Sequence, residues 1–294
     1  MEYQPRVKMK DRLLLILIHT LPKRAVSRLV GRFARSRFSR RLIPFYIRRF
    51  NIDLTQIEKP VQEYDTLLDF FVRGLKPGAR PIDPDERSVV SPVDGTVYQE
   101  GKIHKGTLLQ AKGVTYSLEG LLGGNKEAAK CFDGGQFVTI YLSPRDYHRI
   151  HAPIKGRVYG FSYIPGALYP VNKLGLNHVH GLFAKNERLI TYLETAAGKI
   201  AVVKVGATNV GSIKVTYDSK ICTNRFRPSM EHREYEEVTE LNKGEELGRF
   251  EFGSTVILLF ESNMVRWCTN LEPGSVLQMG EPIAKIIGNK KSKA

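Results

Sequence analysis

From residue 96 onward the chain consists mostly of short apolar segments that alternate with polar positions and end at Gly, Pro or Asn. The segments are rich in β-branched and aromatic residues, which is typical of strands. The strands that we expect cover residues 96–99, 136–142, 157–163, 189–195, 200–205, 212–215 and 254–260. Since no internal repeat is apparent, the pattern predicts one β-rich domain of the α+β class.

The first 50 residues have a helical pattern instead. Val26, Leu29, Val30 and Phe33 recur at the spacing of one helix face, and arginines occupy another side of the same turns. A second short helix is expected over residues 42–50. Further short helices are expected at residues 66–71, 117–122 and 145–148.

Positive charge is concentrated in the same amino-terminal region. The chain has a formal net charge of +15, and residues 1–50 hold fourteen Lys and Arg against two acidic residues. A cationic helix with aliphatic and aromatic residues opposite is typical of a segment lying in a membrane interface. Nucleic-acid binding, a solvated helix packed on the body and a mitochondrial transit peptide are the alternatives. Since the sequence lacks clear nucleic-acid-binding signatures, we favour the membrane and expect no nucleic-acid partner.

The longest apolar run of this region, residues 13–18, is far shorter than the ~20 residues that a spanning helix needs. We therefore expect a peripheral protein, with residues 1–60 as a basic amphipathic region for membrane association and residues 61–294 as the β-rich domain. Three scattered cysteines favour reduced thiols over a disulfide framework. No His and Cys cluster has the spacing of a zinc site, so we expect no metal.

Three segments carry residues suited to nucleophilic catalysis. They are SPVDG at 91–95, SPRDYHRIHAP at 143–153 and FGST at 252–255. Together they supply a carboxylate, two imidazoles and a hydroxyl, which are the parts of an activated nucleophile. Each residue alone is common in ordinary turns and strands, so the hypothesis depends on their combination. The candidate site residues are Asp94, His148, His151, Gly253 and Ser254.

The residue before the serine narrows the chemistry. Gly253 has no side chain, so we expect its backbone to adopt geometries that other residues resist and to bring its carbonyl close to the Ser254 hydroxyl. A serine placed in this way can attack its own chain. The sequence therefore indicates self-processing as well as catalysis.

These segments resemble the phosphatidylserine decarboxylases of the bacterial proenzyme type. The similarity extends from about residue 69 to the end of the chain, and residues 141–153 are its most specific part. Other matching segments are FFVR at 70–73, RPID at 80–83, SPVDG at 91–95, IPG at 164–166, NER at 186–188, VGA at 205–207 and GST at 253–255. One departure is Phe252, where the family often has leucine; we expect this exchange to affect only the rate of cleavage.

The resemblance implies that the chain first cleaves itself. His151, oriented by Asp94, would remove the proton of Ser254, whose oxygen attacks the Gly253 carbonyl and converts the amide into an ester. Elimination then releases residues 1–253, the beta chain, from residues 254–294, the alpha chain. Position 254 becomes dehydroalanine, which hydrolyses to a pyruvoyl group and ammonia. Asp94, His151 and Ser254 are thus the implied charge relay.

The resemblance also implies the catalytic step. The pyruvoyl group formed from Ser254 would take the amine of phosphatidylserine as a Schiff base and act as the electron sink for loss of carbon dioxide. His148 is the candidate for returning a proton to carbon or for orienting the substrate. The product would be phosphatidylethanolamine. Because both lipids reside in a bilayer, the implied partners are the substrate and an anionic membrane surface, on the cytoplasmic face of the cell membrane.

The family suggests a homodimer of alpha/beta heterodimers. We also expect the amino-terminal region to be separable, so that deleting residues 1–50 reduces liposome binding and leaves self-cleavage largely intact. Two alternatives stay open. A membrane-associated serine hydrolase would use Asp94, His151 and Ser254 on an external ester, although the second glycine of a nucleophile elbow is missing. A non-enzymatic membrane-binding β module would use residues 244–255, which faintly resemble a hairpin of lipoyl-carrier domains.

Overall fold

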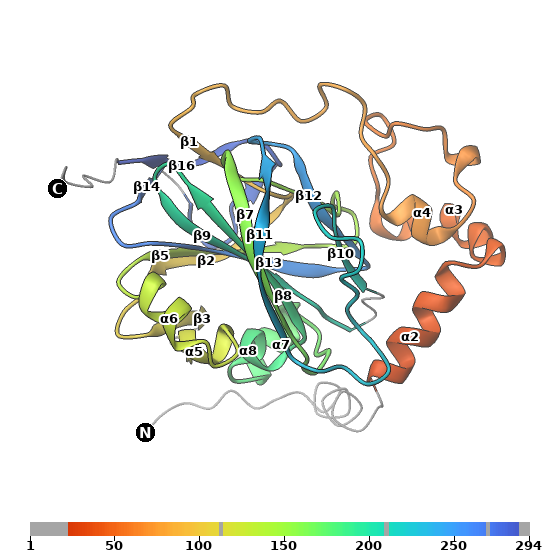
Figure 1. Ribbon diagram of the computed structural model, residues 1–294. Helices are drawn as coiled ribbons and strands as arrows, with labels where there is room; N and C mark the ends of the chain where they lie inside the picture. Colours follow the sequence, from red (N-terminus) through yellow and green to blue (C-terminus); the bar gives the residue numbers. More distant parts are fainter. Residues whose placement is uncertain (1–22, 112–113, 209–211, 269–270, 288–294) are drawn as a thin grey trace, which may run out of the picture.

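The structure is a computed structural model, and it describes residues 23–111, 114–208, 212–268 and 271–287. Its central element is an eight-stranded antiparallel sheet (Figure 1). In order across the sheet, the strands are β11 (Glu231–Leu241), β7 (Gly156–Ile164), β8 (Arg188–Thr195), β9 (Gly198–Val205), β13 (Ser254–Phe260), β5 (Gln136–Leu142), β2 (Gly95–Lys102) and β15 (Val276–Leu277). The β-rich α+β class predicted from the sequence is confirmed.

Smaller sheets and short helices cover the central sheet. Two sheets have three strands each, and a hairpin adds two more. The sheets are β10 (Ser212–Val215), β12 (Glu246–Glu251) and β6 (Arg149–His151), then β1 (Ser88–Val90), β16 (Pro282–Ile286) and β14 (Val265–Trp267), and the hairpin is β3 (Thr107–Ala111) with β4 (Val114–Ser117). The helices are α2 (Lys23–Ala34), η1 (Arg37–Leu42), α3 (Ile43–Phe50), η2 (Val61–Glu63), α4 (Leu67–Phe71), α5 (Leu118–Leu121), α6 (Lys126–Phe132), α7 (Lys173–His178) and α8 (Leu182–Lys185).

Strand alternation produces two hydrophobic cores, one on each face of the central sheet. On β13, Val256 and Leu258 belong to the core shared with the two three-stranded sheets. Ile257 and Leu259 belong to the core shared with α5–α8. Successive strand residues point to opposite faces, so a strand buried on both sides reads as a continuous apolar run. The buried position of β13 in the middle of the sheet follows from this run.

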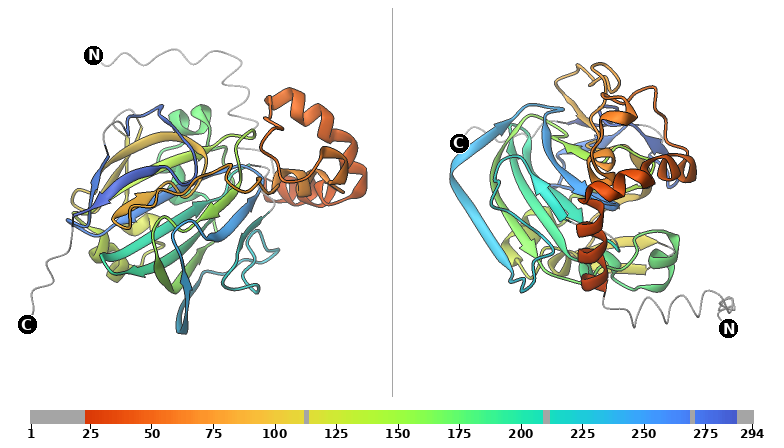
Figure 2. Two further views of the ribbon diagram at one scale, coloured as in Figure 1. Left: turned by 90° about the horizontal axis from the view of Figure 1, so that it is seen from above. Right: turned by 90° about the vertical axis from the view of Figure 1, so that its right-hand side faces the viewer.

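The amino-terminal helices lie on one side of the body (Figure 2), and their buried side chains form a third core. This core includes Ala34, Ile43 and Phe71. It also includes Phe252, which lies almost at the other end of the sequence. The members of this core come from both sides of residue 60. The two expected regions, 1–60 and 61–294, therefore pack against each other in one core.

Helix α2 contacts the body through small side chains. Ser27, Gly31 and Ala34 are buried, whereas Leu29 is 69% exposed and Phe33 is 46% exposed. Of the apolar face that the sequence indicated, Leu29 and Phe33 are thus exposed, whereas Val26 and Val30 are half-buried. Among the described residues, no helix has both the length and the apolar composition to cross a bilayer.

The expected elements agree well with the structure, with one clear exception. All seven expected strands are present, as are the helices near residues 26–33, 42–50, 66–71 and 117–122. The helix expected at residues 145–148 is wrong: this segment is a turn in which the Asp146 carboxylate accepts hydrogen bonds from the backbone N–H and hydroxyl of Ser143, at 2.7 and 2.8 Å. A side chain that satisfies the local backbone in this way competes with helix formation. The apolar run at 13–18 lies outside the described residues.

Candidate functional site

The Gly253–Ser254 bond lies where the chain passes from one sheet to another. Strand β12, which ends at Glu251, pairs with β6 and β10, and β13 begins at Ser254 between β5 and β9. Ser254 is in register with Leu142 of β5. The two residues between the strands, Phe252 and Gly253, therefore make the crossing. The bond is held at both ends by paired strands.

Phe252, and not Gly253, has the unusual backbone conformation of this crossing. Its φ is 84°, in the left-handed region that costs a residue with a side chain about 1 kcal/mol or more. Its ring packs on Phe71, with 4.6 Å between centroids, and only 9% of the residue is exposed. Gly253 has no positive φ, and a Cβ added there would meet nothing within 4 Å. The unusual φ of the crossing therefore belongs to Phe252, and the expected approach of the Gly253 carbonyl to the Ser254 hydroxyl stays a prediction.

His148 is fully buried and is bonded through one nitrogen. Its Nδ1 donates to the Asp146 carbonyl oxygen at 2.8 Å, and its ring lies 4.0 Å from that of Phe71. A carbonyl only accepts, so Nδ1 carries the proton and Nε2 is a bare acceptor. Nε2 is buried and has no partner among the described residues. Burial, helped by the charge of Arg73, lowers the pKa of His148 to about 3, which keeps the ring neutral.

His151 is also set as a neutral acceptor. Its Nδ1 donates to the Gly244 carbonyl oxygen at 2.8 Å, and its Nε2 lies 3.1 Å from the Tyr147 hydroxyl. Burial lowers the pKa of His151 below its ordinary value. The nearby charges of Glu246 and Asp94 act in the opposite direction, because they favour the protonated ring.

Asp94 is buried in an arginine clamp. Its two carboxylate oxygens accept from Nε and Nη2 of Arg80 at 2.8 and 2.5 Å, and Oδ1 also accepts from the Met279 backbone at 2.8 Å. Within the described part of the chain, the hydrogen bonds of His151 go to Gly244 and Tyr147 and not to Asp94. In this conformation Asp94 acts on His151 through its charge, and the Gly244 carbonyl orients the ring.

The pairing of β6 with β12 fixes where His148 and His151 lie relative to the Gly253–Ser254 bond. The Phe250 backbone donates to the His148 carbonyl at 3.0 Å, and His151 is in register with Glu246 at the start of β12. Both histidines thus lie on β6 and its approach, beside the strand that leads to Ser254. His148 has the more direct connection, because Phe71 contacts both its ring and that of Phe252.

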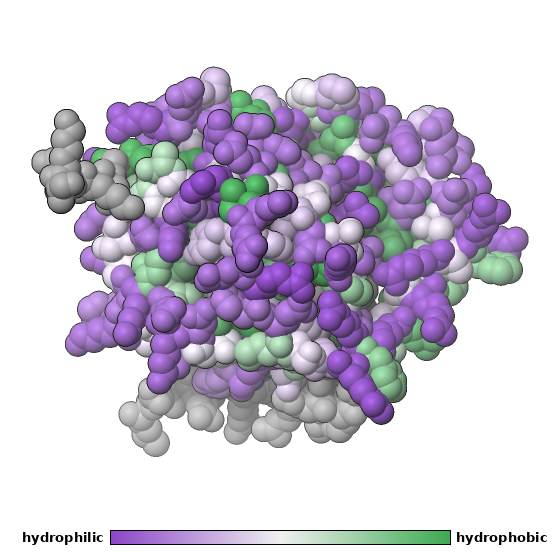
Figure 3. Space-filling model, in the orientation of Figure 1, coloured by the Kyte–Doolittle hydropathy of each residue, from purple (hydrophilic) through white to green (hydrophobic). Residues whose placement is uncertain are grey.

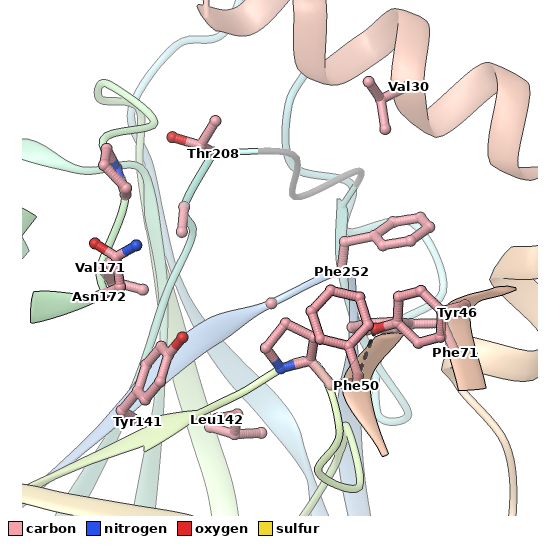
Figure 4. Close-up of a pocket in the computed structure, with 14 residues that line it drawn as sticks. Val30, Tyr46, Phe50, Phe71, Tyr141, Leu142, Val171, Asn172, Thr208 and Phe252 are labelled. Atoms are coloured by element: carbon pink, nitrogen blue, oxygen red, sulfur yellow. Dashed lines mark hydrogen bonds between the residues drawn. The ribbon is translucent and has the colours of Figure 1, made fainter. Parts of the chain in front are cut away.

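A cavity of about 440 Å³ opens beside Gly253 (Figure 4). In Figure 4, Phe252, Phe71, Phe50 and Tyr46 gather on one side of it, and Tyr141 lies on the other. Its full lining is Val30, Tyr46, Phe50, Phe71, Tyr141, Leu142, Pro144, Pro170, Val171, Asn172, Ala207, Thr208, Phe252 and Gly253. A mostly apolar cavity with a few polar groups is typical of a site for an apolar or amphipathic ligand.

Known proteins share this sequence over nearly its full length. A family model described as phosphatidylserine decarboxylase matches residues 67–285. The chain is 53% identical over 277 residues to a phosphatidylserine decarboxylase proenzyme of Brevibacillus brevis, which covers 94% of this chain and 99% of the relative. It is 48% identical over 282 residues to the proenzyme of Myxococcus xanthus, covering 95% of this chain and 100% of the relative. The chain belongs to the phosphatidylserine decarboxylase family.

Several residues of the candidate site were not given a role from the sequence. Tyr147, Arg80 and Phe71 lie inside segments that carry the family resemblance, so a signal was present without a function attached. Arg73 lies in one of them too, and its Nη2 donates to the Arg145 and Asp146 carbonyls at 2.7 and 3.2 Å. It therefore fixes the turn that precedes His148. Among the described residues, no group of three His, Cys, Asp or Glu side chains is arranged to hold a metal ion.

The amino-terminal helices reach the candidate site directly. Arg35, which follows α2, forms an ion pair with Glu251 at the end of β12. The Tyr46 hydroxyl donates to the Pro144 carbonyl at 2.8 Å. Val30 and Phe50 line the cavity beside Gly253. Deleting residues 1–50 would remove these contacts and one wall of the candidate site, so they argue for an effect on self-cleavage; the separability of the region stays a prediction.

Proposed function

We propose that this protein decarboxylates phosphatidylserine to phosphatidylethanolamine, after cleaving itself between Gly253 and Ser254. The observation that carries the proposal is the position of this bond: it lies between two paired strands at the rim of an apolar cavity, and Phe71 connects it to a histidine whose acceptor nitrogen has no partner in the described part of the chain. Family membership supports the same reaction. A serine hydrolase acting through Asp94, His151 and Ser254 is the second candidate.

In the self-cleavage that we propose, His151 accepts the hydroxyl proton of Ser254. Its Nε2 is the unprotonated nitrogen, and its lowered pKa keeps it available as a base at neutral pH. The Tyr147 hydroxyl occupies this nitrogen and would move aside or relay the proton. The charge of Asp94 stabilises the imidazolium that forms. The serine oxygen bonds to the Gly253 carbonyl carbon, the carbon–nitrogen bond breaks, and the proton held by His151 passes to the freed amine of residue 254, which gives an ester.

Elimination from this ester would complete the maturation. A base removes the Cα proton of residue 254, the Cβ–O bond breaks as a carbon–carbon double bond forms, and the carboxylate of Gly253 leaves with the upstream chain. Water then replaces the amine of the resulting dehydroalanine, which releases ammonia and leaves a carbonyl. The pyruvoyl group that results supplies an electron sink for decarboxylating an α-amino acid. The fit of such a group is supported by the bond's position at the cavity rim, with space beside Gly253.

His148 is our candidate for handling the proton of the decarboxylation. As a neutral ring whose Nε2 has no hydrogen-bond partner among the described residues, it offers an acceptor to the substrate's ammonium. The ring would take a proton from this ammonium as the Schiff base forms, while the bound substrate carboxylate favours the protonated ring, and would return the proton to carbon after carbon dioxide has left. The unpaired Nε2 supports this role, since a buried acceptor without a partner is costly unless a ligand satisfies it.

The apolar cavity supports a lipid substrate, and the basic helices support an anionic membrane as the place where it is found. Phe50, Phe71 and Phe252 offer apolar contacts for the glycerol and first acyl carbons. Arginines on α2 and η1 would favour a surface enriched in anionic lipid by about 1 kcal/mol each. We therefore propose a peripheral protein on the cytoplasmic face of the cell membrane, as a dimer of cleaved units.

Intact-mass spectrometry tests the proposal. The purified protein should give two chains that divide before Ser254, and the smaller should shift in mass after hydroxylamine traps its carbonyl. Ser254→Ala should remain one chain and form no phosphatidylethanolamine. A serine hydrolase would instead stay uncut and resist the trapping reagent, so an unbroken active protein refutes our proposal.

A further inference from the structure

The loop between β10 and β11 exposes two large apolar side chains from a fixed base. Phe226 is 79% exposed and Met230 is 58% exposed. At the base of the loop, the Thr223 hydroxyl accepts from the Ile213 backbone at 2.8 Å, and the Asn224 backbone donates to the Glu187 carboxylate at 3.1 Å. Because buried groups hold the base of the loop in place, the fold itself directs Phe226 and Met230 outward. We call residues 222–230 the aromatic loop.

The aromatic loop lies against the amino-terminal helices. The guanidinium carbon of Arg28, in α2, is 5.4 Å from the centre of the Phe226 ring. In Figure 3, hydrophobic side chains lie along the lower right edge, over α2 and the loop beside it. Seven of the eleven exposed large hydrophobic residues in the described part of the chain belong to these elements: Leu29, Phe33, Phe38, Leu42, Phe45, Phe226 and Met230. Exposed apolar residues so concentrated mark an interaction surface.

The charge of this surface selects its partner. Residues 23–50 and 222–230 contain no Asp or Glu, and they carry many arginines. Two copies of the surface would repel each other if they met face to face. An anionic bilayer provides both the negative charge and the apolar interior that this combination of groups requires.

We propose that the aromatic loop is a second membrane contact, in which Phe226 and Met230 enter the interface of an anionic bilayer beside α2, η1 and α3. The inference rests on the proposed function for its lipid substrate. Two membrane contacts that are fixed to the same body define the orientation of the protein on the bilayer. A single helix would leave the protein free to rotate about the helix axis. Since Val30 of α2 lines the cavity, this orientation brings the cavity toward the lipid.

Vesicle sedimentation of the full-length protein provides the first test. We compare the wild type with the double variant Phe226→Ser and Met230→Ser, on phosphatidylcholine vesicles with and without one quarter phosphatidylglycerol. The partition coefficient on anionic vesicles should fall about tenfold, equivalent to about 1.4 kcal/mol. The matched control is Val276→Ser, which changes a 67% exposed residue on β15 at the opposite edge of the sheet. Unchanged partition of the double variant would overturn the proposal.

A fluorescence experiment reports on the loop itself. Trp267 is the single native tryptophan, and Phe226→Trp adds a second. The emission of Phe226→Trp should shift to shorter wavelength on anionic vesicles and should be quenched by brominated lipid, whereas Val276→Trp should show neither effect. Absence of quenching, or a wild-type dimer that the double variant dissociates in the absence of vesicles, would refute insertion.

These readouts separate the inference from the proposed function. Self-cleavage and turnover of a soluble short-chain phosphatidylserine should be unchanged in the double variant, because the loop does not line the cavity. Quenching without decarboxylation would leave the membrane contact standing and refute the proposed function. Loss of self-cleavage in the double variant would instead show that the loop is structural and overturn its assignment as a membrane contact.

Discussion

The ion pair between Arg35 and Glu251 tests how the amino-terminal helices act on the cleavage site. Glu251 is the last residue of β12, directly before Phe252, and its side chain is only 10% exposed, whereas that of Arg35 is 46% exposed. Arg35→Ala would leave an almost buried carboxylate without its cation. We expect Arg35→Ala to slow self-cleavage while the protein still folds.

The expected magnitude lies between two reference cases. Exposed ion pairs contribute about 0.2–1 kcal/mol, and breaking a buried pair costs about 3–5 kcal/mol. For a pair with one exposed and one nearly buried partner, we expect a loss of about 1–3 kcal/mol. If the pair holds the crossing in its reactive geometry, this loss corresponds to a cleavage rate that is about 5–150 times lower.

The assay is cell-free synthesis of the full chain, followed by the decline of the uncut band with time. A double-mutant cycle with Glu251→Gln isolates the pair, and the double variant should be less impaired than the two single effects combined. Arg32→Ala is the matched control, because the described structure gives this exposed α2 arginine no ion pair. Cleavage of Arg35→Ala at the wild-type rate, or additive effects in the cycle, would refute the reasoning.

Further predictions concern single residues. In the uncleavable Ser254→Ala background, Gly253→Ala should change the unfolding free energy by less than about 0.5 kcal/mol, measured by thermal denaturation, because its Cβ meets no atom within 4 Å; a larger loss contradicts this. His148→Ala should still split into two chains by mass spectrometry but lose product formation about 10²–10⁴-fold, and normal turnover would exclude the role. Self-cleavage through His151 should fall only below about pH 6.5, since burial lowers its pKa; a loss beginning above neutrality would argue against it. Lys204 is fully buried and its pKa is well below the ordinary value, so the folded state favours the neutral amine and stability is lost as pH falls below about 10.4. Lys204→Met should therefore be about 1–3 kcal/mol more stable than the wild type at pH 7, with a smaller difference at pH 9, in chemical denaturation; equal stability at both pH values would contradict the assignment.

The central strands could be predicted because each is buried on both faces, and its own residues therefore form an apolar run. Residues 136–142, 212–215 and 254–260 were bounded correctly from apolar and β-branched runs alone. β11 was missed because its sequence, EHREYEEVTEL, is highly charged and mostly exposed at the sheet edge. Such a strand is specified by pairing with β7 rather than by an apolar pattern of its own.

Sequence motifs suggest which residues form the candidate site, and this assignment stays a prediction; the geometry of these residues could not be predicted. Asp94, His148, His151 and Ser254 follow from motifs, whereas the hydrogen bond from His151 to Gly244 joins residues far apart in the sequence. The left-handed conformation of Phe252 also depends on tertiary packing against Phe71, which no local pattern encodes. For the same reason, the ion pair of Arg35 with Glu251 could not be predicted from the sequence. The amino-terminal helices were therefore expected to be independent of the β-rich domain.

The place of β13 has a consequence for the finished enzyme. Six of its residues, Thr255 to Phe260, are paired with strands on both sides. If the proposed function is right, the reactive carbonyl is the first group of a central strand of the sheet. It therefore cannot diffuse away as a soluble coenzyme does. Each molecule then has one covalently bound catalytic group, and no free coenzyme in the cell can replace it. A side reaction that converts that ketone into an amine would end the working life of the molecule, and only new synthesis would restore the activity.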